Sequence, residues 1–191
     1  MHAALDVRPV IVAVAGPNGA GKTTFYKVFL RETGLPFVNA DEISRELDLD
    51  PYTAAAVAAE IRRQLVQQRE SFIFETVLSD PVGEKVSFLR DAASSGYNVV
   101  VCYIGVPGLK VSEERVAMRV SQGGHDVPAD KVAARFPRTL ANLKTAIRVL
   151  PTVLVFDNGD LNAPYRRVAE FERGKRTFLA KPVPAWLAPL L

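Results

Sequence analysis

A glycine-rich segment with one lysine and two threonines follows the first apolar run of the chain. It reads GPNGAGKTT and matches the pattern GxxxxGK[ST] at every required position. Backbone N–H groups of such a loop close around phosphate oxygens, and the helix that follows adds a favourable dipole. We expect Lys22 to reach the β- and γ-phosphates of a nucleoside triphosphate and the Thr23 hydroxyl to ligate Mg²⁺. The residues expected to form the nucleotide site are Gly16, Asn18, Gly19, Ala20, Gly21, Lys22, Thr23 and Thr24.

Three acidic residues stand at or just beyond the ends of predicted strands, where ligands of an open α/β sheet gather. Asp41 is the best candidate for a general base that takes a proton from an acceptor hydroxyl, and its alternative role is a helix cap. Glu75 and the adjacent Thr76 could bind acceptor hydroxyls, or Glu75 could act on Mg²⁺ through water or make an ordinary strand-end hydrogen bond. Asp157 is more typical of a turn.

The sequence lacks the signatures of three other classes that bind nucleotides in a similar loop. No strand ends in the Asp-Glu pair of P-loop hydrolases and motors, and the Asn/Thr-Lys-x-Asp motif of GTPases is absent. An ABC-transporter ATPase is disfavoured because no LSGGQ-like signature occurs. A small phosphotransferase needs less, namely one carboxylate base and cations over the transferred phosphoryl group.

The required cations are expected in a basic segment between residues 110 and 138. Arg115 and Arg119 are four residues apart on one predicted helix and therefore share a face. Two glycines at 123–124 separate that helix from the next, which carries Arg135 and Arg138. This arrangement is typical of a lid whose arginines close over the triphosphate. The alternative is a solvent-exposed face paired with neighbouring glutamates.

Short β-branched runs alternate with longer helical stretches, which predicts an α/β fold with a doubly wound parallel sheet. We expect about five strands, helices on both faces and a helical lid. A single domain is expected over residues 1–191, with an irregular tail over about 159–191 and a small hairpin around Gly174. The predicted strands are Val10–Ala15, Pro36–Val38, Ser71–Glu75, Asn98–Gly105 and Thr152–Phe156.

Apolar spacing predicts which helix faces are buried. Over residues 52–70, Val57, Ile61 and Leu65 form one stripe, with Arg62 turned away from it. Pro137 is expected to end or kink the helix that starts near Pro128, so that another covers about 138–149.

Composition excludes several broad classes of protein. The 191 residues are 48% hydrophobic and 24% charged, which argues against intrinsic disorder. The longest apolar run, 99–106, is far short of a membrane span, and no secretory signal is seen, so we expect a cytoplasmic protein. A single cysteine, Cys102, excludes an internal disulfide framework.

The net charge of +3 argues against a protein that coats nucleic acid, but its distribution is uneven. Residues 1–109 hold ten basic and thirteen acidic residues, whereas residues 110–148 hold eight and four. Residues 161–191 hold six and two. The excess of positive charge therefore lies in the predicted lid and in the tail.

The chain resembles the short zeta-toxin-type P-loop kinases, often labelled predicted ABC-type ATPases, in five motifs that occur in the same order. The resemblance runs from about residue 10 to residue 158. It rests on the combination of motifs, because the phosphate loop alone is unspecific. The motifs are GPNGAGKTTF, FVNADEI, SFIFETVLS, ERVAMRVSQGGHDVPADKVAARF and VFDN.

The resemblance implies an ATP- and Mg²⁺-dependent kinase, since known members phosphorylate a hydroxyl of the sugar in UDP-N-acetylglucosamine. Asp41 then matches the catalytic base and Lys22 the phosphate-binding lysine. Arg119, with Arg115 or Arg135, would supply the arginines that clamp the phosphate. The substrate side would comprise Asn39, Asp41, Glu75 and Thr76.

Two other readings of the sequence stay open. The same chemistry could serve another nucleotide-type acceptor. Alternatively, the chain could be a regulatory ATP-binding module or ATPase without small-molecule kinase activity. An antitoxin partner is compatible with the resemblance but not implied by it, and neither membrane nor nucleic acid is an expected partner.

Overall fold

The first strand of the computed structural model, β1 (Val10–Ala15), is buried along its whole length. Its odd-numbered residues pack into one hydrophobic cluster and its even-numbered residues into another, because successive side chains of a strand point to opposite faces. Every residue of β1 is apolar, so both faces of the sheet have to be covered. The structure describes residues 3–121 and 127–191.

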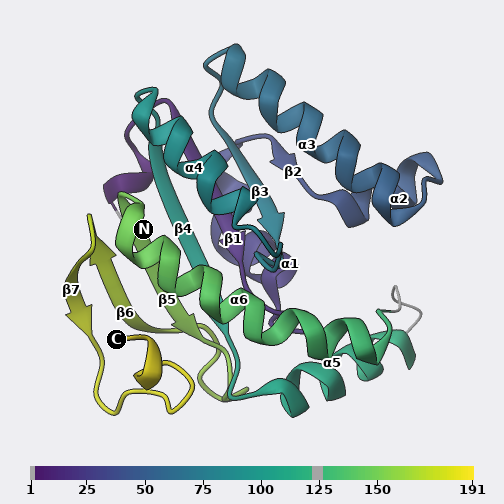
Figure 1. Cartoon of the computed structure of the whole chain (residues 1–191), viewed down its shortest axis with the longest axis vertical. Coiled ribbons are helices and arrows are strands. Elements are labelled where there is room, and N and C mark those ends of the chain that lie inside the picture. Colours follow the sequence, from purple (N-terminus) through teal and green to yellow (C-terminus); the bar gives the residue numbers. More distant parts are fainter. Residues whose placement is uncertain (1–2, 122–126) are drawn as a thin grey trace.

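The described residues form a seven-stranded sheet in the order β2-β3-β1-β4-β5-β6-β7 (Figure 1). Neighbouring strands pair in parallel from β2 across to β5, whereas β6 and β7 are antiparallel. The predicted α/β fold with a parallel sheet is therefore confirmed, and the sheet has two strands more than expected. The strands after β1 are β2 (Phe37–Val38), β3 (Phe72–Thr76), β4 (Asn98–Gly105), β5 (Thr152–Asp157), β6 (Arg166–Glu172) and β7 (Lys175–Leu179).

The two additional strands lie in the predicted irregular tail, so that prediction is wrong for residues 166–172 and 175–179, which belong to the sheet. β6 pairs with β5, and β7 turns back through Arg173 and Gly174, which both have positive φ. The predicted hairpin around Gly174 is thus confirmed. The prolines that suggested irregularity follow β7 rather than interrupting it, and Trp186 and Leu187, which lie among these prolines, are buried in the core.

Helices cover both faces of the sheet. In Figure 1, α4 and α6 lie in front of the strands, while α1 lies behind them. Residues 26–30 continue α1 as a π-helical turn. No helix in the described ranges is both long and apolar enough to span a membrane. The helices are α1 (Lys22–Phe25), α2 (Ala40–Leu47), α3 (Pro51–Gln67), α4 (Glu84–Ser94), α5 (Leu109–Ser121) and α6 (Ala129–Val149), with short 3-10 turns at Ala3–Leu5, Arg31–Thr33 and Ala188–Leu190.

The buried face of α3 differs from the predicted one. Ala54, Ala58 and Arg62 are buried, whereas Ile61 is 37% exposed. The Arg62 guanidinium lies 5.0 Å from the centre of the Phe74 ring, and its aliphatic stem packs as an apolar side chain would. The prediction that Arg62 turns away was wrong because small alanines let the helix approach the sheet on the arginine side.

Helix α6 is continuous through Pro137, where the sequence predicted an end or a kink between two helices. The Arg138 side chain donates from Nε to the carbonyl of Ala134 at 2.9 Å, so it satisfies a backbone acceptor beside the proline. Arg135 and Arg138 consequently lie on one helix that packs against α5 (Figure 1). The glycines 123–124 of the predicted lid lie outside the described residues.

Candidate active site

The loop between β1 and α1 is closely packed against the sheet. A Cβ on Gly16 would lie 2.2 Å from the carbonyl oxygen of Ile104 on β4, so only glycine fits there. The loop ends at Gly21, whose φ of 88° is the left-handed conformation that glycine adopts without strain, and α1 begins at Lys22. The predicted P-loop therefore stands between a buried strand and a helix, as its pattern requires.

Lys22 is buried in this loop and faces charged groups of both signs. Its Nζ donates to the carbonyl of Pro17 at 3.1 Å and lies 3.7 Å from Oε1 of Glu75. Burial lowers the pKa of Lys22 below its usual range, while Glu75 and Asp41 raise it and Arg119 lowers it. Four of the residues predicted from the sequence thus interact electrostatically at one point of the structure.

Glu75, at the end of β3, connects the P-loop with the segment after β2. Its Oε2 accepts from the Thr23 hydroxyl at 2.8 Å and from Nδ2 of Asn39 at 3.1 Å. These contacts form because β2, β3 and β1 are adjacent and parallel, so that their carboxyl ends meet at one edge. The Thr23 hydroxyl and the Glu75 carboxylate are hard oxygen donors of the kind that Mg²⁺ prefers.

Asp41 is exposed in the first turn of α2, and it is not the helix cap. That role belongs to Asn39, whose Oδ1 accepts from the backbone N–H of Asp41 at 2.9 Å. Within the described part of the chain, the Asp41 carboxylate has no hydrogen bond and no ion pair. The side chain is therefore available to a ligand beside Lys22.

Helix α5 packs directly on the P-loop and carries two of the predicted arginines. The Ser112 hydroxyl donates to the carbonyl of Asn18 at 2.6 Å. A Cβ on Gly19 would lie 3.0 Å from Cβ of Arg115, which places that arginine against the loop. Arg119 follows one turn later, and its positive charge lowers the pKa of Lys22.

Three other candidate residues are engaged elsewhere or stand apart. Arg135 is half-buried on α6, and in residues 3–121 and 127–191 no hydrogen bond or ion pair joins it to Lys22 or Glu75. Thr76 accepts a local hydrogen bond from the N–H of Leu78 at 2.9 Å. Asp157 accepts from Nε1 of Trp186 at 2.8 Å, so it anchors the C-terminal segment to the end of β5.

Sequence reasoning missed three residues that contact the P-loop: Ser112, Asn158 and Tyr165. Asn158 donates from Nδ2 to the carbonyl of Ala20 at 2.9 Å, and the Tyr165 hydroxyl donates to the carbonyl of Gly21 at 3.0 Å. Only Asn158 could have been recognised from the sequence, because it directly follows the end of a strand. The contacts of the other two depend on tertiary packing that no spacing in the sequence records.

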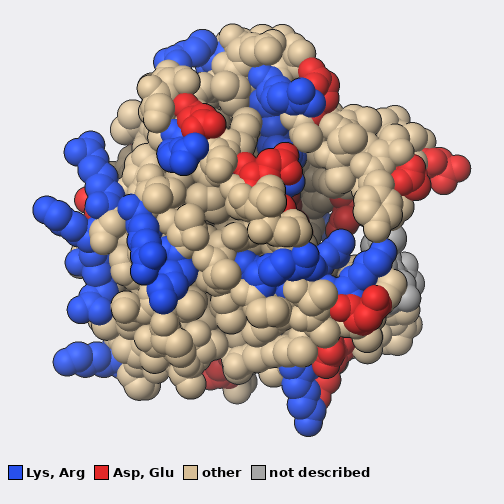
Figure 2. Space-filling view, in the orientation of Figure 1, with Lys and Arg blue, Asp and Glu red and all other residues tan. Residues whose placement is uncertain are grey.

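A recess lies between two pairs of helices. Figure 2 shows the surface hollowed between the α2–α3 pair and the α5–α6 pair, with acidic and basic side chains around the hollow. Lys131, in the first turn of α6, donates from Nζ to the Tyr52 hydroxyl near the start of α3 at 3.2 Å and lies 5.4 Å from the centre of the ring. The two walls of the recess therefore meet at this contact.

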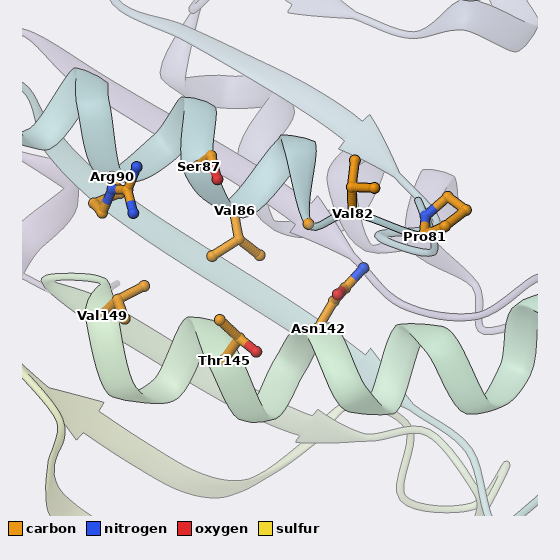
Figure 3. Close-up of a pocket in the computed structure, with 9 residues that line it drawn as sticks. Pro81, Val82, Val86, Ser87, Arg90, Asn142, Thr145 and Val149 are labelled. Carbon is orange, nitrogen blue, oxygen red and sulfur yellow. The ribbon is translucent and has the colours of Figure 1, made fainter.

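A separate cavity of about 310 Å³ lies between α4 and α6, and no predicted site residue lines it. Figure 3 shows Asn142 and Thr145 of α6 facing Val86 of α4 across it. Asn142 is already occupied, because its Nδ2 donates to the carbonyls of Leu78 and Asp80 at 2.9 and 3.0 Å. The charged groups described above are therefore gathered at the P-loop rather than at this cavity.

Comparison with known proteins gives a family match and relatives of similar fold. A family model described as zeta toxin matches residues 3–170. A protein of Haemophilus influenzae is 25% identical in an alignment of 126 residues, and the match covers 63% of this chain and 88% of that protein.

Two solved structures share the fold at low identity. A chain of the AvrRxo1-ORF1:-ORF2 complex solved with ATP is 19% identical with a TM-score of 0.71, and the match covers 89% of this chain and 60% of that chain. A chain of the PezAT toxin-antitoxin system of Streptococcus pneumoniae is 15% identical with a TM-score of 0.54, covering 85% and 71%. This chain thus spans less than two thirds of its AvrRxo1 counterpart.

Proposed function

The chain belongs to the zeta toxin family, and from this premise we propose that it is an ATP-dependent kinase acting on a hydroxyl of a small acceptor. One observation carries the proposal. Glu75 joins the buried Lys22 and Thr23 of the P-loop to Asn39, the cap of the helix on which the uncommitted Asp41 carboxylate lies. This arrangement combines a phosphate site with a carboxylate that can accept a proton.

The P-loop is proposed to bind the triphosphate of ATP. Its backbone N–H groups and the Lys22 ammonium would bind phosphate oxygens. Mg²⁺ would be held by the Thr23 hydroxyl and, directly or through water, by Glu75. When bound, the ion supplies charge neutralisation at the phosphate oxygens.

In the proposed transfer, the acceptor oxygen forms a bond to the γ-phosphorus while the bond from that phosphorus to the ADP oxygen breaks. Asp41 accepts the proton that the acceptor hydroxyl loses. Arg119, assisted by Arg115 on the same face of α5, stabilises the negative charge that develops on the transferred group. Asn39 and Glu75 hold the substrate-side edge of the P-loop in place.

The recess between α2–α3 and α5–α6 (Figure 2) is the proposed acceptor site, because Asp41 lies in the first turn of α2, one of the helices that border it. We propose a UDP-N-acetyl amino sugar as the acceptor, on the motifs that the chain shares with zeta-toxin-type kinases. A cytoplasmic location, where ATP and nucleotide sugars occur, accords with that activity.

An antitoxin partner is also proposed. Two proteins of similar fold support it, since one is part of a toxin-antitoxin system and the other was solved as a complex of two proteins. Co-purification of the tagged chain with a protein encoded next to its gene would test this partner, and loss of growth arrest on co-expression would confirm its role.

The kinase proposal is tested by incubating the purified protein with ATP, Mg²⁺ and a panel of sugar nucleotides, and by following products by mass. We expect a mass gain of one phosphoryl group on UDP-N-acetylglucosamine or a close analogue, and no gain with Lys22→Met. Absence of any phosphorylated acceptor, together with ATP hydrolysis that DNA stimulates, would overturn the proposal in favour of a regulatory ATPase.

A further inference from the structure

The outer side of the P-loop is held by a loop that comes more than 130 residues later in the chain. In this β5–β6 loop, residues 158–165, Asn158 donates to the carbonyl of Ala20 and Tyr165 to the carbonyl of Gly21, at 2.9 and 3.0 Å. The two donors are also joined to each other, because the Tyr165 backbone N–H donates to Oδ1 of Asn158 at 3.3 Å.

The geometry of the peptide bond links these outer contacts to the phosphate side. In a trans peptide unit, the C=O of one residue and the N–H of the next point in opposite directions. A donor that holds the Ala20 carbonyl outward therefore turns the N–H of Gly21 inward. The Gly21 carbonyl accepts both from the Phe25 backbone N–H at 2.9 Å and from the Tyr165 hydroxyl, and these two donors together turn the N–H of Lys22 inward, toward the space where phosphate oxygens would bind.

The β5–β6 loop fits the P-loop closely enough to fix it. A Cβ on Gly21 would lie 2.7 Å from the Tyr165 hydroxyl oxygen and 2.9 Å from Nδ2 of Asn158. The Tyr165 ring makes edge contacts with Phe25 and Phe29, at centroid distances of 5.4 and 5.6 Å. Both donors are thereby held by packing as well as by hydrogen bonds.

The β5–β6 loop is itself anchored. The backbone N–H of Asn158 donates to the carbonyl of Gly105 at 2.9 Å, and the preceding Asp157 accepts from Trp186. A Cβ on Gly105 would lie 2.1 Å from the Trp186 ring, which packs flush against the end of β4. The C-terminal segment thus supports the loop that supports the phosphate site.

We propose that Asn158 and Tyr165 are positioning residues that pre-orient the N–H groups of Gly21 and Lys22 for the polyphosphate of the nucleotide. This inference rests on the proposed function only in that the P-loop binds ATP. It needs neither a particular acceptor nor a particular catalytic base. Because the donors act from the outer side, they should affect any polyphosphate equally.

The first test compares Tyr165→Phe with Tyr97→Phe. The Tyr97 hydroxyl donates to the carbonyl of Glu70 at 3.0 Å, so the control removes the same type of hydrogen bond far from the P-loop. The dissociation constants of ATP and of inorganic tripolyphosphate are measured by calorimetry. We expect Tyr165→Phe to weaken both ligands about three- to tenfold and by similar factors, and Tyr97→Phe to leave both unchanged.

A second variant and its control keep the inference testable if Tyr165→Phe does not fold. Asn158→Ala removes one donor to the P-loop and one acceptor for Tyr165, whereas Asn142→Ala removes two donated bonds at Leu78 and Asp80. We expect Asn158→Ala to weaken both ligands about tenfold, while Asn142→Ala lowers only the melting temperature.

Each outcome of these binding measurements bears on a specific proposal. Unchanged polyphosphate affinity in Tyr165→Phe and Asn158→Ala would overturn the inference, as would a loss confined to ATP, which indicates direct contact with the nucleoside. Wild-type protein that binds neither ligand would overturn the inference and the nucleotide part of the proposed function together. Wild-type protein that binds ATP without phosphorylating any acceptor would contradict the kinase proposal alone.

Discussion

Among single residues, Glu75 is the one that links the other groups of the site. Its side chain is 11% exposed and contacts Lys22 and Thr23 at the start of α1 and Asn39 in the segment after β2. A buried carboxylate is stabilised by such donors, and it in turn keeps a buried ammonium charged. Glu75 therefore couples the charge of the P-loop lysine to the position of the segment that carries Asp41.

The substitution Glu75→Gln tests this coupling. The amide keeps the shape of the side chain but removes the charge that opposes the burial of Lys22, so we expect Mg²⁺–ATP to bind at least about tenfold more weakly. Titration calorimetry measures the effect. Glu60→Gln is the matched control, since Glu60 pairs with Arg63 on the exposed surface of α3 and should have no influence. Equal affinities of wild type and Glu75→Gln would contradict this role.

The residues of the P-loop were predictable because their chemistry depends on a fixed spacing within one segment. Asp41 was predictable as a candidate base, but the sequence could not separate that role from helix capping. The structure assigns the cap to Asn39. The role of Tyr165 was not predictable. Its hydroxyl contacts the Gly21 carbonyl, 144 positions earlier in the chain, and this contact depends on how the β5–β6 loop packs in the folded protein.

At the scale of elements, the strands were predicted most accurately and the buried faces of helices least. Strands buried on both faces are continuous apolar runs, which the sequence shows directly. On α3, spacing alone favoured the larger aliphatic side chains over small alanines and an arginine. The pattern of hydrophobicity does not record that an arginine stem can pack over aromatic rings of β3 and α4.

Two substitutions on α3 distinguish the observed face from the predicted one. Arg62→Ala removes a buried stem and its contacts with Phe74 and Phe88, so we expect a loss of about 2 kcal/mol of unfolding free energy. Ile61→Ala should cost less than about 1 kcal/mol, because Ile61 is largely exposed for an aliphatic residue. Urea unfolding of both variants measures the two losses of unfolding free energy. A larger loss in Ile61→Ala would mean that the predicted stripe is the buried one.

At the scale of the whole molecule, the uneven charge has two separate explanations. Part of the positive charge of residues 110–148 belongs to α5, where Arg115 and Arg119 approach the P-loop. The basic residues of the tail lie in and around the β6–β7 hairpin, and Figure 2 shows basic side chains on the side of the molecule where β7 lies in Figure 1. Charged residues on an edge strand discourage pairing with other chains, so this part of the charge needs no ligand.

Burial in the sheet also gives the stability of the whole molecule a defined pH dependence. Burial raises the pKa of Cys102 on β4 from 9.0 to about 12. Between these values the unfolded chain loses the thiol proton and the folded chain keeps it, so stability falls as the pH rises. Relative to Cys102→Ala, the wild type should lose about 1.4 kcal/mol per pH unit above pH 9. Urea unfolding at pH 8.0 and 10.5 measures the difference, and an equal change in both proteins would contradict it.

We propose that this site transfers a phosphoryl group with Asp41 as the base, and single-turnover kinetics of an Asp41 variant test this step. Phosphoryl transfer from ATP to the best acceptor of the panel is followed under single-turnover conditions for wild type and Asp41→Asn, with ATP affinity measured in parallel. We expect the transfer rate of Asp41→Asn to fall about 10²- to 10⁴-fold while ATP affinity changes little. Transfer of the phosphoryl group by Asp41→Asn at the wild-type rate would show that Asp41 is not the base.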